Sequence, residues 1–223
     1  MQNFWEGKRF VSLGDSIVRQ NGKVYGDTDQ IAKGFQSWMK ELLGFEDYDN
    51  FGVSGRPMAN GSANGDGTNK TGKSVSFYQI YDLVIIADGT NDFKLNVPIG
   101  EPGQIGDTDF DTRIFYCAYR DLIEHILKDK PEIRIVLFTP LQRDHSGYDV
   151  NFTNAAGHRL INYANAITQI GELNGIPVCD MYRESGFTQL TLSAFTYDGV
   201  HPNDRGYEWM GFYGAGFIAN IGS

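Results

Sequence analysis

Short apolar runs recur along the chain, and segments in which apolar residues have a helical spacing separate most of them. Residues 83–87 form an unbroken apolar run, as expected for a strand covered on both faces in a parallel sheet. Residues 31–43 instead place apolar side chains three and four positions apart, which predicts a helix with one buried face. The other runs predict strands at residues 11–13, 48–51, 133–138 and 176–179. The other helical patterns cover residues 112–128, 153–173 and 204–220.

Alternating strands and helices predict an α/β fold with a parallel sheet and helices on both faces. At 223 residues, the chain has the length of one such domain, so residues 1–223 are predicted to form a single domain. Ligand sites in these sheets gather where strands reach their carboxyl ends. The remaining segments are rich in Gly, Asn, Asp or Pro and predict loops or irregular structure at residues 17–28, 59–74, 94–110, 142–152 and 183–197.

Several polar residues with catalytic potential follow the predicted strands. Ser16 comes directly after the first strand, and a serine nucleophile needs a base, a group that orients this base, and donors for the oxyanion. Asp198 and His201 are three positions apart, so in a turn both side chains can lie against one surface. Gly52 has no side chain, so its N–H can approach a reacting carbonyl, and Asn91 offers a side-chain amide as a further donor.

Taken in order, the four clusters resemble the motifs of the SGNH (GDSL-type) hydrolase family. They are Gly14-Asp15-Ser16, Asn50-Phe51-Gly52-Val53-Ser54-Gly55, Gly89-Thr90-Asn91-Asp92 and Asp198-Gly199-Val200-His201. The resemblance covers residues 9 to about 210, with one departure at Ile17, where many members carry Leu.

This resemblance implies a flavodoxin-like three-layer α/β/α sandwich with about five parallel strands. It also implies a serine esterase that works through an acyl-enzyme without metal or cofactor. Ser16 is then the nucleophile, His201 the base and Asp198 the residue that orients it. The oxyanion hole would consist of the backbone N–H groups of Ser16 and Gly52 and the side chain of Asn91.

The substrate is less closely defined by the sequence. The family includes lipases, lysophospholipases, thioesterases and carbohydrate O-acetylesterases. The absence of a long apolar lid and the polar, Gly- and Asn-rich loops favour short acyl groups, such as acetyl esters on a glycan. The excursions at residues 59–74 and 94–110 are expected to shape the substrate site. His145 and His158 lie in or near a segment expected at the same rim, where they can contact substrate.

Two other classes of function compete with hydrolysis. Residues 67–74 match the phosphate-binding loop pattern, which needs a strand before it and a long helix after it. Residues 59–66, directly before the pattern, cannot form a buried strand. Only eight residues separate Ser74 from the strand that begins at Leu83, which is too few for a crossover helix, so the match is interpreted as accidental. The second alternative is a glycan-binding module that has lost hydrolysis, against which the intact set of Ser16, Asn91, Asp198 and His201 argues.

Charge and composition narrow the range of partners. The net charge of −9 and the pI near 4.8 disfavour a surface for nucleic acid or anionic membranes. No run approaches the roughly 18 apolar residues that span a bilayer, and the first ten residues lack a signal-peptide core, so a soluble chain is expected. Cys117 and Cys179 fall in apolar elements and are predicted to be buried thiols rather than a disulfide.

Overall fold

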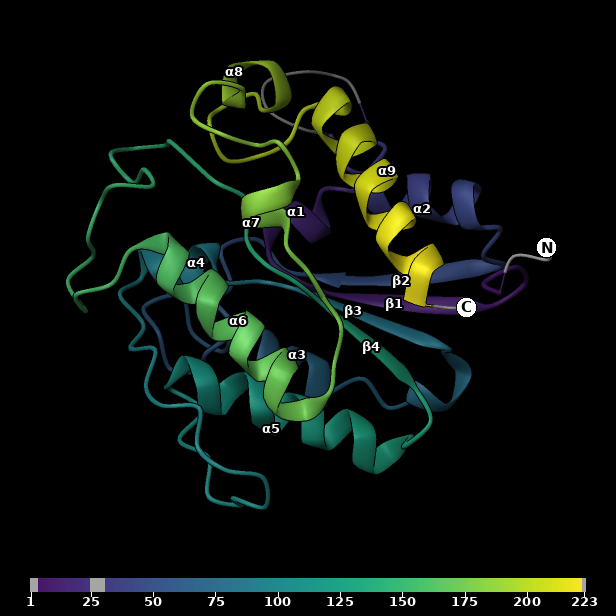
Figure 1. Ribbon diagram of the computed structural model, residues 1–223, viewed down its shortest axis with the longest axis horizontal. Coiled ribbons are helices and arrows are strands. Elements are labelled where there is room, and N and C mark those ends of the chain that lie inside the picture. The colour runs from purple at the N-terminus through teal and green to yellow at the C-terminus, as the bar shows by residue number, and fades with distance from the viewer. Residues whose placement is uncertain (1–3, 25–30, 222–223) are drawn as a thin grey trace.

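Five parallel strands form the centre of the structure, a computed structural model that describes residues 4–24 and 31–221 (Figure 1). Their spatial order is β2-β1-β3-β4-β5, and all neighbouring strands pair in parallel. The strands are β1 (Arg9–Gly14), β2 (Asp47–Gly52), β3 (Leu83–Ala87), β4 (Arg134–Phe138) and β5 (Val178–Cys179). Each of the five predicted strands is therefore present.

Helices cover both faces of this sheet and complete three layers (Figure 1). On one face lie α3 (Thr68–Lys73), α5 (Phe115–Asp129) and α6 (Leu160–Asn174), and on the other α2 (Phe35–Leu43) and α9 (Asp204–Ile221). Shorter helical elements stand at strand ends and in loops: α1 (Ser16–Arg19), η1 (Tyr78–Ile80), α4 (Thr90–Lys94), α7 (Met181–Glu184) and α8 (Leu192–Phe195). The predicted three-layer α/β/α fold is confirmed.

The central strand β3 supplies both hydrophobic cores. Val84 and Ile86 point into the core beneath α5 and α6, whereas Leu83 and Ile85 point into the core beneath α2 and α9. All four side chains are fully buried, and each contributes about 1.5–3 kcal/mol through the area it removes from water. The unbroken apolar run in the sequence reflects this burial on two faces.

Strand register places the functional loops along one edge of the sheet. Gly14, the last residue of β1, pairs with Gly52 at the end of β2 and with Ala87 at the end of β3. Ala87 in turn pairs with Phe138 at the end of β4. The loops that follow these strands therefore begin side by side, as parallel α/β sheets require.

Two helices begin later in the chain than predicted. The helix predicted for residues 31–43 begins at Phe35, because Gly34 is extended and Ile31 is mostly exposed. The helix predicted for residues 153–173 begins at Leu160. Here the side chain of Asn154 accepts N–H bonds from Ala156 and His158, and it thereby stabilises a turn instead of a first helical turn.

The segment 59–74 is not entirely a loop, because α3 occupies its second half. Gly72 lets this short helix approach α5, since a Cβ there would lie 2.5 Å from a Leu122 methyl group. Lys73, the lysine of the phosphate-binding pattern, ion-pairs with Asp121 at 2.7 Å. No strand lies directly before the pattern, because β2 ends at Gly52 and residues 53–66 of the described chain form turns and loops. A helix of only six residues follows, in agreement with an accidental match.

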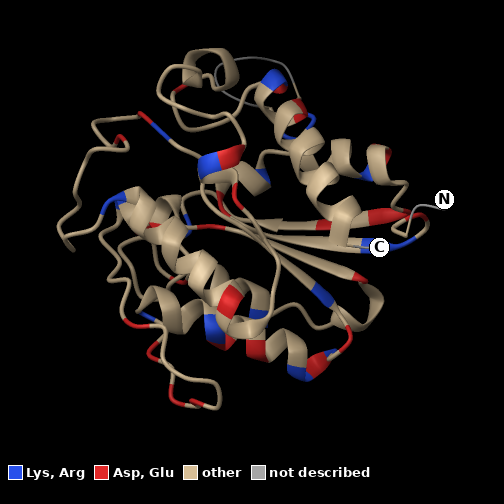
Figure 2. Cartoon of the chain, viewed as in Figure 1, with Lys and Arg blue, Asp and Glu red and all other residues tan. Residues whose placement is uncertain are grey.

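Charged side chains are spread over the outside of the helices and loops (Figure 2). The long loop between α4 and α5 carries Asp and Glu but no Lys or Arg between residues 101 and 111. Within the described residues, no helix is long and apolar enough to cross a membrane. Cys117 and Cys179 are free thiols; Cys179 is buried as predicted, whereas Cys117 is only half-buried.

Candidate active site

Ser16 stands at the carboxyl end of β1, where the strand turns into α1. The turn is tight because Gly14 lies against β3: a Cβ on Gly14, whose φ is +156°, would come within 2.1 Å of the Ala87 carbonyl oxygen. Asp15 caps the short helix, its Oδ1 accepting the Ile17 N–H at 2.8 Å. These contacts hold Ser16 as the first helical residue at the rim of the sheet.

A chain of hydrogen bonds links Ser16 to the loop before α9. Ser16 Oγ lies 2.9 Å from His201 Nε2, although the two residues are 185 positions apart. His201 Nδ1 lies 2.7 Å from Asp198 Oδ2. The other carboxylate oxygen, Asp198 Oδ1, accepts the backbone N–H groups of Val200 at 3.0 Å and His201 at 2.8 Å. The three predicted triad residues thus form one continuous hydrogen-bonded series.

The environment of Asp198 keeps its carboxylate ionised. Burial alone would raise the pKa of Asp198, but hydrogen bonds from the His201 ring and from two backbone N–H groups outweigh it and lower the pKa to about 2. An ionised Asp198 accepts the Nδ1 proton of His201, which leaves Nε2 free to accept a proton from Ser16. The ring of Tyr197 stacks on the His201 imidazole, with centroids 5.6 Å apart and planes 13° from parallel.

The structure does not support Gly52 as an oxyanion donor. The Gly52 N–H donates to Asn50 Oδ1 at 2.9 Å, so a neighbouring side chain already occupies it. Gly52 is also the last residue of β2 and packs on α1. A Cβ on Gly52 would lie 2.3 Å from the backbone nitrogen of Arg19. Its small size serves this close contact between strand and helix.

The turn after β2 contains a second glycine, Gly55, close to Asn91. Asn91 Nδ2 donates to the Arg56 carbonyl at 3.0 Å and, more weakly, to Asp15 Oδ2 at 3.3 Å. Gly55, directly before Arg56, has a left-handed φ of +74°. Within the described part of the chain, the N–H groups of Gly55 and Ser16 donate no hydrogen bond. Sequence reasoning chose the first glycine of the 50–55 cluster, because it cannot show that the strand continues to Gly52.

Three buried carboxyl groups lie behind this rim and were not anticipated. Burial raises the pKa of Asp15 to about 6, although the Ile17 N–H and the charges of His201 and Arg143 favour the ionised form. Burial also raises the pKa of Asp88 and of Asp92. Asp92 accepts the backbone N–H groups of Met58 at 2.8 Å and Ala59 at 3.1 Å. This carboxyl group ties the start of the 59–74 segment to α4, which carries Asn91.

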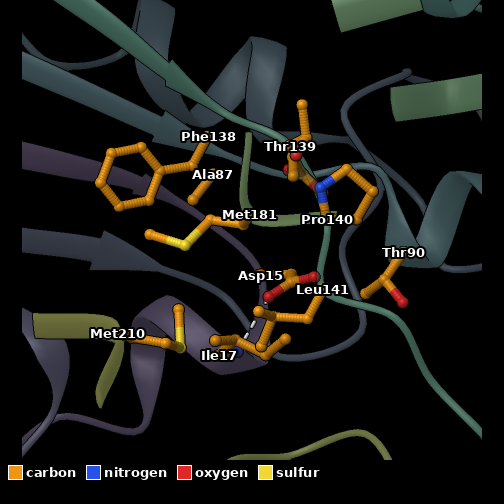
Figure 3. A pocket seen from close by; sticks show the side chains of 11 residues that line it. Asp15, Ile17, Ala87, Thr90, Phe138, Thr139, Pro140, Leu141, Met181 and Met210 are labelled. Atoms are coloured by element: carbon orange, nitrogen blue, oxygen red, sulfur yellow. Dashed lines mark hydrogen bonds between the residues drawn. The ribbon is translucent and has the colours of Figure 1, made fainter. Parts of the chain in front are cut away.

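Behind Asp15 lies a small apolar cavity, with a free volume of about 20 Å³ (Figure 3). The side chains of Ile17, Leu141, Met181 and Met210 surround it, and Asp15 projects toward them. Ser16 does not line it. The cavity therefore belongs to the packing beneath the turn that carries Ser16, and its apolar walls account for the desolvation of Asp15.

The loop after β4 carries the two histidines that the sequence places near the rim and an arginine that the sequence does not single out. His145 reaches Asp198, with Nδ1 2.6 Å from its backbone carbonyl oxygen. His158 instead lies next to Tyr163, with ring centroids 6.0 Å apart. Arg143, which carried no signal in the sequence, is only 3% exposed and donates to Thr90 Oγ1 at 2.9 Å. It connects this loop to the segment that carries Asn91.

Comparison with known proteins places this geometry in a family. Residues 12–209 match the model of the GDSL-like lipase/acylhydrolase family. No functionally curated protein sequence matches the chain.

Several solved structures share the fold. A protein from Lactobacillus plantarum has a TM-score of 0.78 and 21% identity, over 96% of this chain and 98% of that one. A possible lipase from Chitinophaga pinensis has a TM-score of 0.76 and 22% identity, over 96% and 99%. An acetylxylan esterase from Geobacillus stearothermophilus has a TM-score of 0.63 and 19% identity, over 96% and 94%. The family match extends from the strand before Ser16 to beyond His201, and the chain belongs to the GDSL-like lipase/acylhydrolase family.

Proposed function

We propose that this protein is a serine esterase in which Ser16, His201 and Asp198 form the catalytic triad. The observation that carries the proposal is the hydrogen-bonded series from Ser16 Oγ through His201 to Asp198. Ser16 Oγ attacks the ester carbonyl carbon and gives its proton to His201 Nε2, which passes it to the departing alcohol. Water then attacks the acyl-enzyme and gives a proton to the same nitrogen. Release of the acid returns that proton to Ser16.

The oxyanion of each tetrahedral intermediate needs donors that are already in place. The Ser16 and Gly55 N–H groups, which have no acceptor among the described residues, are suited to this role. Asn91 Nδ2 completes the set by exchanging its longer contact, that to Asp15 Oδ2 at 3.3 Å, for the oxyanion. The bond from Asn91 to the Arg56 carbonyl would keep this amide oriented beside Gly55.

For the substrate, we propose a short acyl group, in particular acetyl, on a carbohydrate. The groove between the segments 60–63 and 95–98 has a mixed lining, in which Ser62, Asn96 and Arg113 are polar and Leu95, Val97 and Ile114 are apolar. Such a lining suits both the hydroxyl groups and the apolar face of a sugar ring. A structural neighbour described as an acetylxylan esterase has the same fold. The alternatives are a lipase, a lysophospholipase or a thioesterase of the same family, which would need room for a longer or different acyl group.

Labelling with a fluorophosphonate probe tests the nucleophile. The probe reacts with a serine that a neighbouring base activates, so wild-type protein is expected to take up one label per chain, located on Ser16 by peptide mapping. His201→Gln is expected to slow labelling strongly, because the proton acceptor is lost. A folded wild-type protein that takes up no label would contradict the esterase and favour a glycan-binding module without hydrolytic activity.

A series of p-nitrophenyl esters from acetyl to octanoyl tests the acyl preference. The kcat/KM for acetyl is expected to exceed that for octanoyl by about tenfold or more, since a short acyl site has no apolar surface for the additional methylenes. Acetylated xylo-oligosaccharides, with release of acetate as the readout, test the carbohydrate part. A preference for octanoyl over acetyl would instead indicate a lipase or lysophospholipase.

A further inference from the structure

His145 contacts the carboxylate side of the triad from a different part of the chain. Its Nδ1 lies 2.6 Å from the Asp198 backbone oxygen and 3.8 Å from Asp198 Oδ2. The same Oδ2 accepts the bond from His201. Two imidazole rings therefore approach one aspartate, one from the turn that contains it and one from the loop after β4.

The first of these contacts determines where the proton of His145 lies. A backbone carbonyl oxygen only accepts hydrogen bonds, so Nδ1 of His145 must be the donor. The neutral ring then carries its proton on Nδ1 and not on Nε2. Its N–H dipole points at the Asp198 peptide, close to the carboxylate oxygen that orients His201.

The loop itself does not depend on this side chain. The Asp144 N–H donates to the Gly199 carbonyl at 2.9 Å, and His145 and Tyr148 exchange backbone hydrogen bonds of 3.3 and 3.0 Å. The Asp144 backbone lies so close to Gly199 that a Cβ on Gly199 would be 1.9 Å from the Asp144 carbonyl oxygen. Backbone contacts thus hold the loop against the turn, and the His145 imidazole acts on Asp198.

Asp198 has few other fixed contacts. Its Oδ1 is held by N–H groups of its own turn, from Val200 and His201. These bonds fix the carboxylate relative to His201, and the Asp144–Gly199 contact joins the turn to the β4 loop one residue beyond Asp198. The His145 Nδ1–H adds a bond at the Asp198 peptide itself, from a loop that Arg143 connects to Thr90 next to Asn91.

We propose that His145 is a positioning residue for the triad, which fixes the Asp198 peptide and with it the distance from His201 to Ser16. This inference rests on the proposed function. Loss of the Nδ1–H donor lets the Asp198 peptide shift, and a displacement of about 1 Å at reacting groups can slow an enzyme by about 10²-fold. The expected effect is a loss in kcat of about tenfold, with KM unchanged because the His145 ring contacts Asp198 through Nδ1 in the described structure.

Kinetics with p-nitrophenyl acetate on two variants test the role of His145. His145→Leu removes the donor and is expected to lower kcat about tenfold without changing KM. His145→Asn places an amide N–H near the position of Nδ1 and is expected to restore kcat to within about threefold of wild type. A ring that only fills space would show no such rescue. His125→Asn, on α5 where the ring contacts Tyr78, is the control and is expected to keep the wild-type kcat.

Ser16→Ala, measured in parallel, separates the two proposals. Wild-type activity in Ser16→Ala would overturn the esterase mechanism itself. If Ser16→Ala is inactive and His145→Leu keeps the wild-type kcat, only the role of His145 is overturned. Equal losses in His145→Leu and His145→Asn would also overturn it, because the N–H donor would then make no difference. Circular dichroism and thermal unfolding confirm that each variant is folded.

Discussion

Replacing Ser16 with alanine is expected to lower kcat for ester hydrolysis by about 10⁴-fold or more. The variant retains the donors for the oxyanion and the groove for the substrate but has no atom that can form the acyl-enzyme. KM is expected to change little, because the hydroxyl contacts His201 and contributes little to binding of the ground state. The measurement is kcat and KM with p-nitrophenyl acetate on protein of wild-type thermal stability.

Stability should be nearly unaffected by this change. The Ser16 side chain makes one hydrogen bond in the described structure, to a half-buried ring, and its loss is worth about 1 kcal/mol or less. Ser76→Ala, at an exposed serine between α3 and η1, serves as the control and is expected to keep full activity. A folded Ser16→Ala protein with more than about a tenth of wild-type activity would require another nucleophile.

The strands were predictable because burial imposes a simple pattern on the sequence. In β3, consecutive side chains enter opposite cores, so the residues from Leu83 to Ile86 are all apolar. Helix α3 was not predictable in the same way. It contains Gly72, which opposes a helix, and it forms because this glycine allows close packing against Leu122. Tertiary contact outweighs local preference there, and no pattern within the segment reveals the contact.

The same distinction applies to the site. Ser16, Asp198 and His201 lie in short motifs whose order along the chain is informative, and the structure brings them together. The choice between Gly52 and Gly55 depends instead on strand register and on which N–H is already occupied. The roles of His145 and Arg143 depend on how the loop after β4 folds across the rim, which local sequence does not determine.

Arg143 is a buried cation near the site, and its replacement is expected to have a large effect on stability. Its guanidinium is buried, bonds Thr90 through Nη1 and lies 5.8 Å from the Tyr148 ring centroid. Burial lowers the pKa of Arg143, whereas the charges of Asp15 and Asp198 raise it. The same cation lowers the pKa of Asp15, which burial has raised to about 6. Arg143 therefore compensates a carboxylate that lies in an apolar environment.

The pKa of Asp15 determines in which direction the stability of the folded protein changes with pH. Its pKa is about 6 in the folded protein and near the ordinary 3.8 in the unfolded chain, so the folded state binds more protons between these values. The contribution of Asp15 to stability therefore falls as the pH rises from about 4 to 6 and is constant above. Removing Arg143 raises the folded pKa further, so the fall continues to higher pH.

Arg143→Met is accordingly expected to destabilise the protein by about 3 kcal/mol at pH 8, where Asp15 would have to be ionised without its cation. The loss should be smaller at pH 5, where Asp15 is protonated in both proteins. Urea unfolding at the two pH values measures this difference through the transition midpoints. Arg143→Lys keeps the charge but loses the guanidinium geometry, so its loss of stability should be nearly independent of pH. Equal destabilisation by Arg143→Met at pH 5 and pH 8 would show that Arg143 stabilises the rim through its hydrogen bonds to Thr90 and not through its charge on Asp15.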